Sequence, residues 1–430
     1  MPDAQGAVHQ AVAAVWRIES ARLVAAVARL VRDVGVAEDL AQDALLAALD
    51  HWPRDGVPDK PGAWLMTTAK RRALDHLRHR QMADGHHGAL AQDLLAQEVL
   101  HVPDFVDALD AARQDDIGDD LLRLIFTACH PLLSTEARVA LTLKLLGGLS
   151  TPEIARAFLL PEATIAQRIV RAKRTLGAAG VPFEVPHGEA LVERLASVLE
   201  VVYLIFNEGY TASSGGDWMR PALCDEALRL GRMLAELAPQ RAEVHGLVAL
   251  MEIQASRTAA RTDAQGRPVL LAAQDRGRWD RLLIRRGLAA LARAEALGTP
   301  PGPYQLQAAI AACHASAPTA EATDWGRIVA LYDELAGTAP SPVVALNRAV
   351  AVAMHRGPAA GLAIVDTLLA DPALRAYQWL PSVRGDLLQR LGRLAEARAA
   401  FEHAASLAGN AREKALLQAR AAALHRFTGG

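Results

Sequence analysis

The stretch Gly148-Leu-Ser-Thr-Pro-Glu-Ile-Ala-Arg-Ala-Phe-Leu-Leu-Pro-Glu-Ala-Thr-Ile-Ala-Gln-Arg-Ile-Val-Arg-Ala-Lys-Arg-Thr-Leu176 predicts two short helices joined by a tight turn. Ser150 and Glu153 have the spacing of a capping box, and Pro152 suits the first turn of a helix because that turn does not use its missing N–H. Pro161 begins a second helix after only a few residues. We therefore expect a helix-turn-helix over this stretch.

The second of these helices combines a buried stripe with basic outer faces. Its apolar residues follow helical spacing: Ile165, Ile169, Ala172 and Leu176. The polar residues left for the other faces are Thr164, Gln167, Arg168, Arg171, Lys173 and Arg174. Arg and Gln side chains can contact guanine and adenine edges in a DNA major groove, whereas Lys173 and Arg174 suit phosphates. The alternative is a helical hairpin with a solvated charged face.

Length and composition favour a helical protein of two or three domains. The chain has 430 residues, of which 51% are hydrophobic and only 4% aromatic, and this balance is typical of an all-α fold. Three cysteines, Cys129, Cys224 and Cys313, are too few and too far apart for a disulfide framework or a zinc site. The sequence lacks a signal peptide and any apolar run of about 18 residues. We expect a soluble, cytoplasmic protein that does not enter a membrane.

Residues 8–80 predict three helices with opposite charges on two of them. Gly35 is expected to separate the first helix from the second, Val36–Leu49, and the turn-rich stretch His51–Gly62 to end the second. The second helix presents a polar, mostly acidic outer surface made of Glu38, Asp39, Gln42 and Asp43. The third helix, Ala63–Arg80, carries Lys70, Arg71, Arg72, Arg78 and Arg80 against a single carboxylate, Asp75.

The balance of charge reverses after this helix. Residues 81–120 contain ten Asp or Glu and one Arg, which together with Gly85-His-His-Gly88 predicts an acidic flexible linker over residues 81–119. Helical periodicity resumes from residue 120 and leads into the helix-turn-helix, giving a second domain over residues 120–178. Glycines and prolines between residues 177 and 186 mark the next boundary.

Residues 187–427 predict a third, helical domain with weak internal repeats. Val344–Val365 aligns with Trp379–Ala400 so that Gly357 falls on Gly392, a spacing of 35 residues, near the tetratricopeptide period of 34. The segment Arg257–Asp280 is expected to be a loop that interrupts the array.

The order of these segments resembles the sigma-70 family of RNA polymerase sigma factors, of the extracytoplasmic-function subfamily. Ala37-Glu-Asp-Leu-Ala-Gln-Asp43 is similar to region 2.2 of that family, which binds the clamp helices of the polymerase β′ subunit. By this match Asp39, Gln42 and Asp43 would contact polymerase. The helix-turn-helix corresponds to region 4.2, which reads the minus-thirty-five element next to the β flap.

The same resemblance assigns the basic third helix to promoter opening. Trp64-Leu-Met-Thr-Thr-Ala-Lys-Arg-Arg-Ala-Leu-Asp-His-Leu-Arg78 is similar to regions 2.3 and 2.4, which melt and read the minus-ten element. The residues this implies for unpaired DNA are Trp64, Lys70, Arg71, Arg72 and Arg78. Trp64 has a competing interpretation, since a Trp at helical spacing beside Leu65 is more often part of a core than a stacking surface.

The long C-terminal region resembles the subgroup with a fused tetratricopeptide-like domain, which is thought to modulate activity and which could contact regions 2 and 4 within the chain. Core RNA polymerase and promoter DNA are the expected partners. The chain lacks the common catalytic and phosphate-binding motifs, so we expect no enzyme, catalytic residues, cofactor or metal. The alternative function is a helix-turn-helix regulator with a tetratricopeptide-type sensor, which would bind operator DNA without polymerase.

Overall fold

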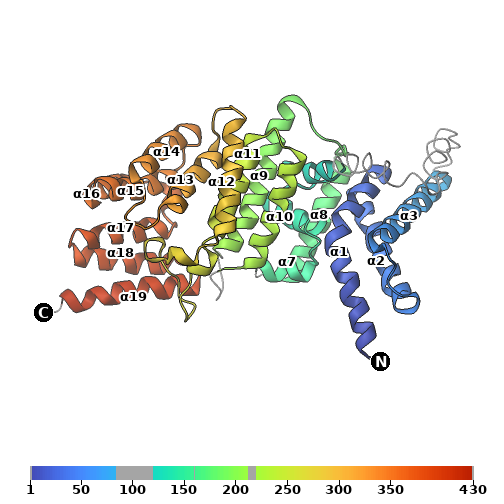
Figure 1. The fold of residues 1–430 in the computed structure, drawn as a ribbon, viewed down its shortest axis with the longest axis horizontal. Helices are drawn as coiled ribbons and strands as arrows, with labels where there is room; N and C mark the ends of the chain where they lie inside the picture. The colour runs from blue at the N-terminus through green and yellow to red at the C-terminus, as the bar shows by residue number, and fades with distance from the viewer. Residues whose placement is uncertain (1, 84–119, 159, 212–218, 429–430) are drawn as a thin grey trace. The chain divides into compact units, whose positions relative to one another are not determined.

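The computed structural model describes residues 2–83, 120–158, 160–211 and 219–428, and in this part of the chain every regular element is a helix (Figure 1). The only β feature in these ranges is an isolated bridge between Thr262 and Pro268. The all-α fold predicted from composition is therefore confirmed. The chain divides into two compact units, unit 1 (Met1–Val201) and unit 2 (Val202–Gly430).

Unit 1 contains two groups of helices. The named helices are α1 (Pro2–Val31), α2 (Val34–Asp55), α3 (Pro61–Ala83), α6 (Thr135–Leu145), α7 (Thr151–Phe158), α8 (Glu162–Ala178) and the beginning of α9 (Gly188–Tyr210). Residues 120–128 are also helical. Buried residues such as Leu23, Ala41 and Leu65 join α1, α2 and α3 in one small core. Most of the predicted acidic linker, residues 84–119, lies outside the described residues.

The break between the first two helices is not at Gly35, and that prediction is wrong. Arg32 adopts a left-handed φ of 54°, and Asp33 then caps α2 by accepting hydrogen bonds from the backbone N–H groups of Gly35 and Val36 at 2.7 and 3.0 Å. Gly35 lies inside the first turn of α2. The Asp33 cap supplies the start signal, as an N-cap carboxylate commonly does.

The helix-turn-helix forms as predicted, with α7 and α8 as its two helices. The Ser150 backbone N–H donates to Glu153 Oε2 at 2.7 Å, and the Glu153 N–H is 3.4 Å from Ser150 Oγ, which confirms the capping box. Pro161 stands at the N-cap of α8, and the predicted stripe Ile165, Ile169, Ala172 and Leu176 is buried. This stripe fixes which faces of α8 point outward.

The first half of α9 packs on the helices that precede it in unit 1. The Ser197 hydroxyl donates to the backbone carbonyl of Cys129 at 2.6 Å, and Arg194 donates to that of Phe126 at 2.8 Å. Arg138, which is buried, reaches the Ser197 hydroxyl and lies 3.1 Å from Glu200. These bonds cap carbonyls at the end of the helix at residues 120–128, so α9 completes this part of unit 1.

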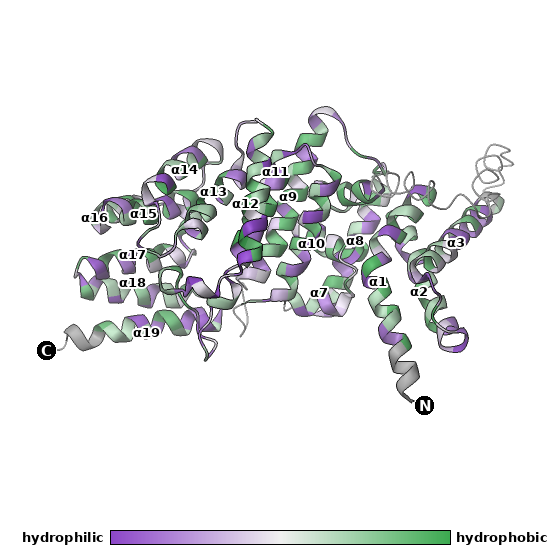
Figure 2. Ribbon diagram, in the orientation of Figure 1, coloured by the Kyte–Doolittle hydropathy of each residue, from purple (hydrophilic) through white to green (hydrophobic). Residues whose placement is uncertain are grey.

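Unit 2 is built from consecutive helices with hydrophobic and hydrophilic residues interleaved along them (Figure 2). After the end of α9 they are α10 (Pro221–Leu237), α11 (Ala242–Ala255), α12 (Arg281–Ala296), α13 (Pro303–Ser316), α14 (Trp325–Thr338), α15 (Pro342–Arg356), α16 (Pro358–Leu368), α17 (Trp379–Arg390), α18 (Leu394–Leu407) and α19 (Ala411–Thr428). Three 3-10 turns fill the predicted loop, η1 (Thr258–Ala260), η2 (Leu271–Ala273) and η3 (Arg276–Arg278).

The predicted repeat appears as two helix pairs, α15–α16 and α17–α18. Gly357 and Gly392 stand between the helices of each pair with φ of 97° and 73°, a conformation that favours glycine because it has no Cβ. Leu388, Phe401 and Ala404 belong to the core that these pairs share. Helices α17, α18 and α19 pack in sequence order and lie side by side (Figure 1).

Candidate nucleic-acid interface

The outer face of α8 presents a row of donors suited to DNA. Gln167, Arg171 and Arg174 are exposed, whereas Thr164 and Arg168 are half-buried. The stripe of four apolar residues on the opposite face anchors the helix, so these side chains are held on a rigid element rather than on a loop. A helix with this arrangement can enter a major groove.

Lys173, also predicted to bind phosphate, lies in a different environment. Its side chain is only 18% exposed, and its ammonium group contacts Glu38 and lies 3.4 Å from Asp39 Oδ1. Both carboxylates belong to α2, more than 130 residues earlier in the sequence. In this arrangement Lys173 is engaged by protein carboxylates, and its contact with a phosphate stays a prediction.

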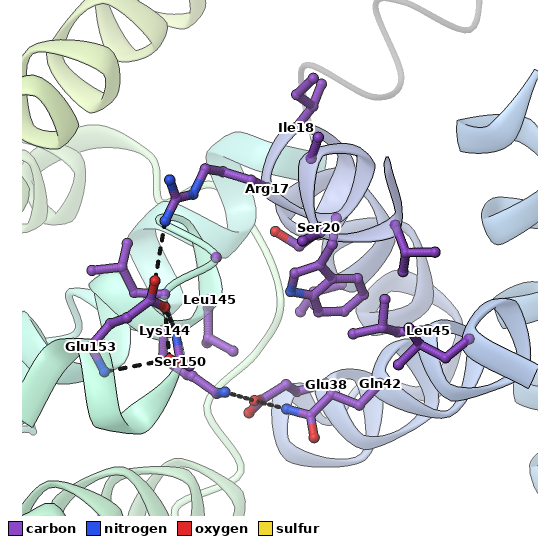
Figure 3. A pocket seen from close by; sticks show the side chains of 18 of the residues that line it. Arg17, Ile18, Ser20, Glu38, Gln42, Leu45, Lys144, Leu145, Ser150 and Glu153 are labelled. Atoms are coloured by element: carbon purple, nitrogen blue, oxygen red, sulfur yellow. Dashed lines mark hydrogen bonds and ion pairs between the residues drawn. The ribbon is translucent and has the colours of Figure 1, made fainter. Parts of the chain in front are cut away.

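The sequence predicts that Glu38 lies on the outer surface of α2, and this prediction is wrong. Its side chain is 4% exposed, because Lys173 of α8 and Lys144 of α6 cover it; Lys144 Nζ is 3.5 Å from Glu38 Oε1. Gln42 donates to the same oxygen at 2.5 Å (Figure 3). The four-residue acidic surface is therefore smaller than predicted, and its first member faces inward.

The other residues of the α2 surface remain accessible to different degrees. The Asp39 side chain is 76% exposed. Asp43 is about half exposed, and its Oδ2 lies 3.5 Å from Arg72 Nη1 of α3. An ion pair this exposed contributes little, about 0–1 kcal/mol, so a partner with better geometry can replace it. Asp39, Gln42 and Asp43 thus share one face of α2, with Glu38 beneath it.

Helix α3 carries the basic surface predicted for the minus-ten element. Arg71 and Arg78 are exposed, and Lys70 and Arg72 are half-buried. Arg78 Nη1 forms an exposed ion pair with Asp75 at 3.1 Å, within the same helix. The positive charge of this helix exceeds its negative charge over about three turns, from Lys70 to Arg80, which suits a nucleic-acid backbone.

Trp64 lies between the two interpretations that the sequence left open. Its indole is half-buried and packs edge-on against Trp52, with ring centroids 5.6 Å apart and an angle of 71° between the planes. Trp52 is 1% exposed and belongs fully to the core. The contact fixes the Trp64 ring while leaving part of it accessible, so a stacking role stays a prediction.

The cysteines of the described residues are all free thiols. Burial raises the pKa of Cys129 to about 11 and that of Cys224 to about 12, so both are protonated at neutral pH. No group of three His, Cys, Asp or Glu side chains within the described ranges is arranged to hold a metal ion. Of the helices that the structure describes, none combines the length and apolar character that a membrane span requires.

Comparisons with known proteins match the two groups of helices in unit 1 separately. The family model for sigma-70 region 2 matches residues 17–82, which cover the second half of α1, all of α2 and all but the end of α3. The model for sigma-70 region 4 matches residues 123–176, which include α6, α7 and nearly all of α8. A family of unknown function, DUF6596, matches residues 194–295.

Relatives of this chain match different shares of it. An uncharacterized protein of Rhizobium meliloti (strain 1021) is 44% identical over 393 residues, 91% of each chain. The ECF RNA polymerase sigma factor SigC of Mycobacterium tuberculosis is 31% identical over 151 residues, 35% of this chain and 73% of SigC. SigK of Mycobacterium ulcerans, also an ECF sigma factor, is 30% identical over 162 residues, 36% of this chain and 78% of SigK.

The two region models define the class of protein as a sigma-70 family RNA polymerase sigma factor. The similarity to SigC and SigK shows that the chain belongs to the extracytoplasmic-function (ECF) subfamily. SigC and SigK each match little more than a third of this chain, 35% and 36%, whereas the Rhizobium meliloti protein matches 91% of it.

Proposed function

We propose that this sigma factor, acting in the cytoplasm and not itself an enzyme, brings core RNA polymerase to promoters through three surfaces. Asp39, Gln42 and Asp43 on α2 bind the β′ clamp helices. The basic face of α3, with Trp64, holds the melted minus-ten strand. The exposed face of α8 reads the minus-thirty-five duplex near the β flap. The observation that carries the proposal is the match of both sigma-70 regions, in family order, to the helices that bear these residues.

A pull-down with core RNA polymerase tests the α2 surface. Asp39→Ala combined with Asp43→Ala removes two charges from it, and we expect the full chain to lose at least tenfold in polymerase affinity, about 1.4 kcal/mol. Asp50→Ala with Asp55→Ala is the matched control, because these carboxylates are exposed at the far end of the same helix. Unchanged binding of the first variant would favour a regulator that binds operator DNA alone.

We further propose that the C-terminal helices modulate transcription. The bonds of α9 to Phe126 and Cys129 dictate where the chain is cut for this test. Truncation after Gly180 removes them, whereas truncation after Val201 keeps them. We expect the 1–201 fragment to bind polymerase with altered promoter output and the 1–180 fragment to be less stable. Identical output from the full chain and the 1–201 fragment would argue against modulation.

A further inference from the structure

The buried carboxylate of Glu38 is the centre of a contact between helices of region 2 and region 4 within unit 1. Lys144 and Lys173, 19% and 18% exposed, approach it from α6 and α8. Asp39 adds a second negative charge 3.4 Å from Lys173. Two ammonium groups thus meet two carboxylates, so the cluster has no uncompensated charge that would oppose its burial.

The backbones approach each other closely around this cluster. A Cβ on Gly35 would lie 3.7 Å from the Cβ of Lys173, so α8 crosses the first turn of α2 where the latter has no side chain. Nearby, a Cβ on Gly148 would be 2.7 Å from Ser20 Oγ of α1. The fit between the two regions therefore depends on small residues at the crossing points, which is a sign of a specific contact.

Away from the ion pairs the same two regions are separated by a groove rather than by packed side chains (Figure 3). Its volume is about 830 Å³, and apolar side chains of α1 and α2, including Trp16, Leu45 and Leu49, line it opposite Leu145 and Leu149. Arg17 and Glu153 form an exposed ion pair at its rim, 3.2 Å apart. The contact therefore combines ion pairs with an apolar groove that side chains do not fill.

We propose that this contact is a docked state of the free protein in which region 4 covers part of the polymerase-binding helix, and that polymerase and promoter DNA bind after it opens. The proposal rests on the proposed function of α2 and α8. Docking engages Asp39 and, through Glu38, Gln42 on one side, and Lys173 on the other. Polymerase therefore competes with the intramolecular contact for the α2 residues, and DNA competes with it for Lys173. When polymerase binds α2 it frees Lys173 for DNA, and when DNA binds Lys173 it frees the α2 residues for polymerase.

A disulfide test uses the 3.7 Å spacing at Gly35, which lies within the range of disulfide-bonded Cβ atoms. The full chain carrying Gly35→Cys and Lys173→Cys should cross-link under mild oxidation at least tenfold faster than Gly35→Cys with Arg174→Cys. The latter is the matched control because Arg174 is the next residue of α8 and points outward. Gly35→Cys alone reports pairing with the native cysteines. Equal rates for the two pairs would overturn docking.

The same protein then tests occlusion. Oxidised Gly35→Cys/Lys173→Cys should bind core polymerase at least tenfold more weakly than its reduced form, and reduction should restore binding. Equal binding of both forms would overturn occlusion. A reduced protein that binds no polymerase would instead overturn the proposed function, while the cross-linking ratio would still decide whether the two regions dock.

Lys144→Gln provides a second variant that leaves every predicted polymerase and DNA residue in place. It removes one of the two cations from Glu38, and a smaller docked fraction should tighten the apparent Kd for polymerase by about fivefold. Arg22→Gln is the control, since this exposed cation of α1 pairs only weakly with Glu19 at 3.7 Å. An unchanged or weaker affinity of Lys144→Gln, with the thermal melt preserved, would overturn the proposal.

Discussion

Two sets of cations are held by different kinds of partner. The first set lies at the region 2–region 4 contact in unit 1, and the second is the arginine cluster of unit 2, which consists of Arg257, Arg261 and Arg276. In unit 1, Lys144 and Lys173 meet carboxylates. In unit 2, Arg276 donates to the carbonyls of His314 and Ala317, both at 2.6 Å, and lies 5.0 Å from the Trp279 ring centroid.

Arg261 of the same cluster is 6% exposed and follows the second pattern. It donates to the Tyr210 carbonyl and, at 3.0 Å, to the Thr211 hydroxyl, while its guanidinium carbon lies 3.5 Å from the Tyr210 ring centroid. A carboxylate can be exchanged for a phosphate or for a carboxylate of another protein, whereas the carbonyl and ring of Tyr210, at the end of α9, are fixed parts of the fold. The comparison separates charges that suit reversible binding from charges that hold a fold.

The largest effect should come from the arginine cluster. Arg261→Ala should lower the free energy of unfolding by about 4 kcal/mol, because it removes two hydrogen bonds from a charged donor and a ring contact in a buried site. Arg261→Lys should rescue little, since an ammonium group lacks the planar fork. Urea unfolding of the full chain measures both. Arg278→Ala, exposed in the same loop, should stay within about 0.5 kcal/mol. An equally small loss for Arg261→Ala would erase the distinction between the two kinds of cation.

The second-largest effect is a pH dependence of the stability of unit 2. Burial, together with Arg257 and Arg276, lowers the pKa of His314 from 6.5 to about 4. The unfolded chain therefore binds this proton first as the pH falls, so the stabilisation is present above pH 6.5 and is lost toward pH 4. The loss approaches about 3 kcal/mol. Urea midpoints at pH 7 and pH 4.5 should differ less in His314→Gln than in the parent; equal differences would show that His314 is not protected.

The third effect concerns DNA binding by the basic residues of α8 rather than stability. Arg168→Ala and Arg171→Ala should each weaken binding of the holoenzyme to promoter duplex by about 1–3 kcal/mol. Each lost phosphate contact should also reduce the salt slope by about 0.9. Filter binding across a salt series measures both quantities, with Arg22→Ala as the control. If neither slope nor promoter preference changes, α8 is a solvated hairpin and not a reader.

The smallest effect should come from the capping box that starts the helix-turn-helix. Ser150→Ala should cost about 1 kcal/mol, because Ser150 and Glu153 satisfy each other's backbone N–H groups. Amide hydrogen exchange in α7 measures this local loss. Unchanged protection would mean that packing of Ile154 alone sets the start of α7.

Local patterns predicted the elements whose causes are local. The capping box, the buried stripe of α8 and the turns at Gly357 and Gly392 all depend on residues within a few positions of each other. The prediction of a helix break at Gly35 was wrong although the cause of the break is also local. A glycine is only a generic helix breaker, whereas Asp33, two residues earlier, is a specific N-cap.

Glu38 could not be placed from the sequence because its burial is caused by residues far along the chain. Its helical neighbours predict an outward position, and only Lys144 and Lys173 of region 4 turn that position into an interior one. The arginine cluster was missed in the same way, since Tyr210 and Trp279 are 69 residues apart and meet only in the fold. The assignment of Asp39, Arg171 and the other surface residues to partners depends on family resemblance and stays a prediction.

Transcription by reconstituted core RNA polymerase tests the central claim most directly. Fragmented genomic DNA is transcribed with and without the full chain, and the 5′ ends of the RNA are sequenced. We expect new start sites that share paired minus-thirty-five and minus-ten elements and that disappear with Asp39→Ala/Asp43→Ala but not with Asp50→Ala/Asp55→Ala. The account would be contradicted if the start sites were identical with and without the protein and the protein did not bind the polymerase.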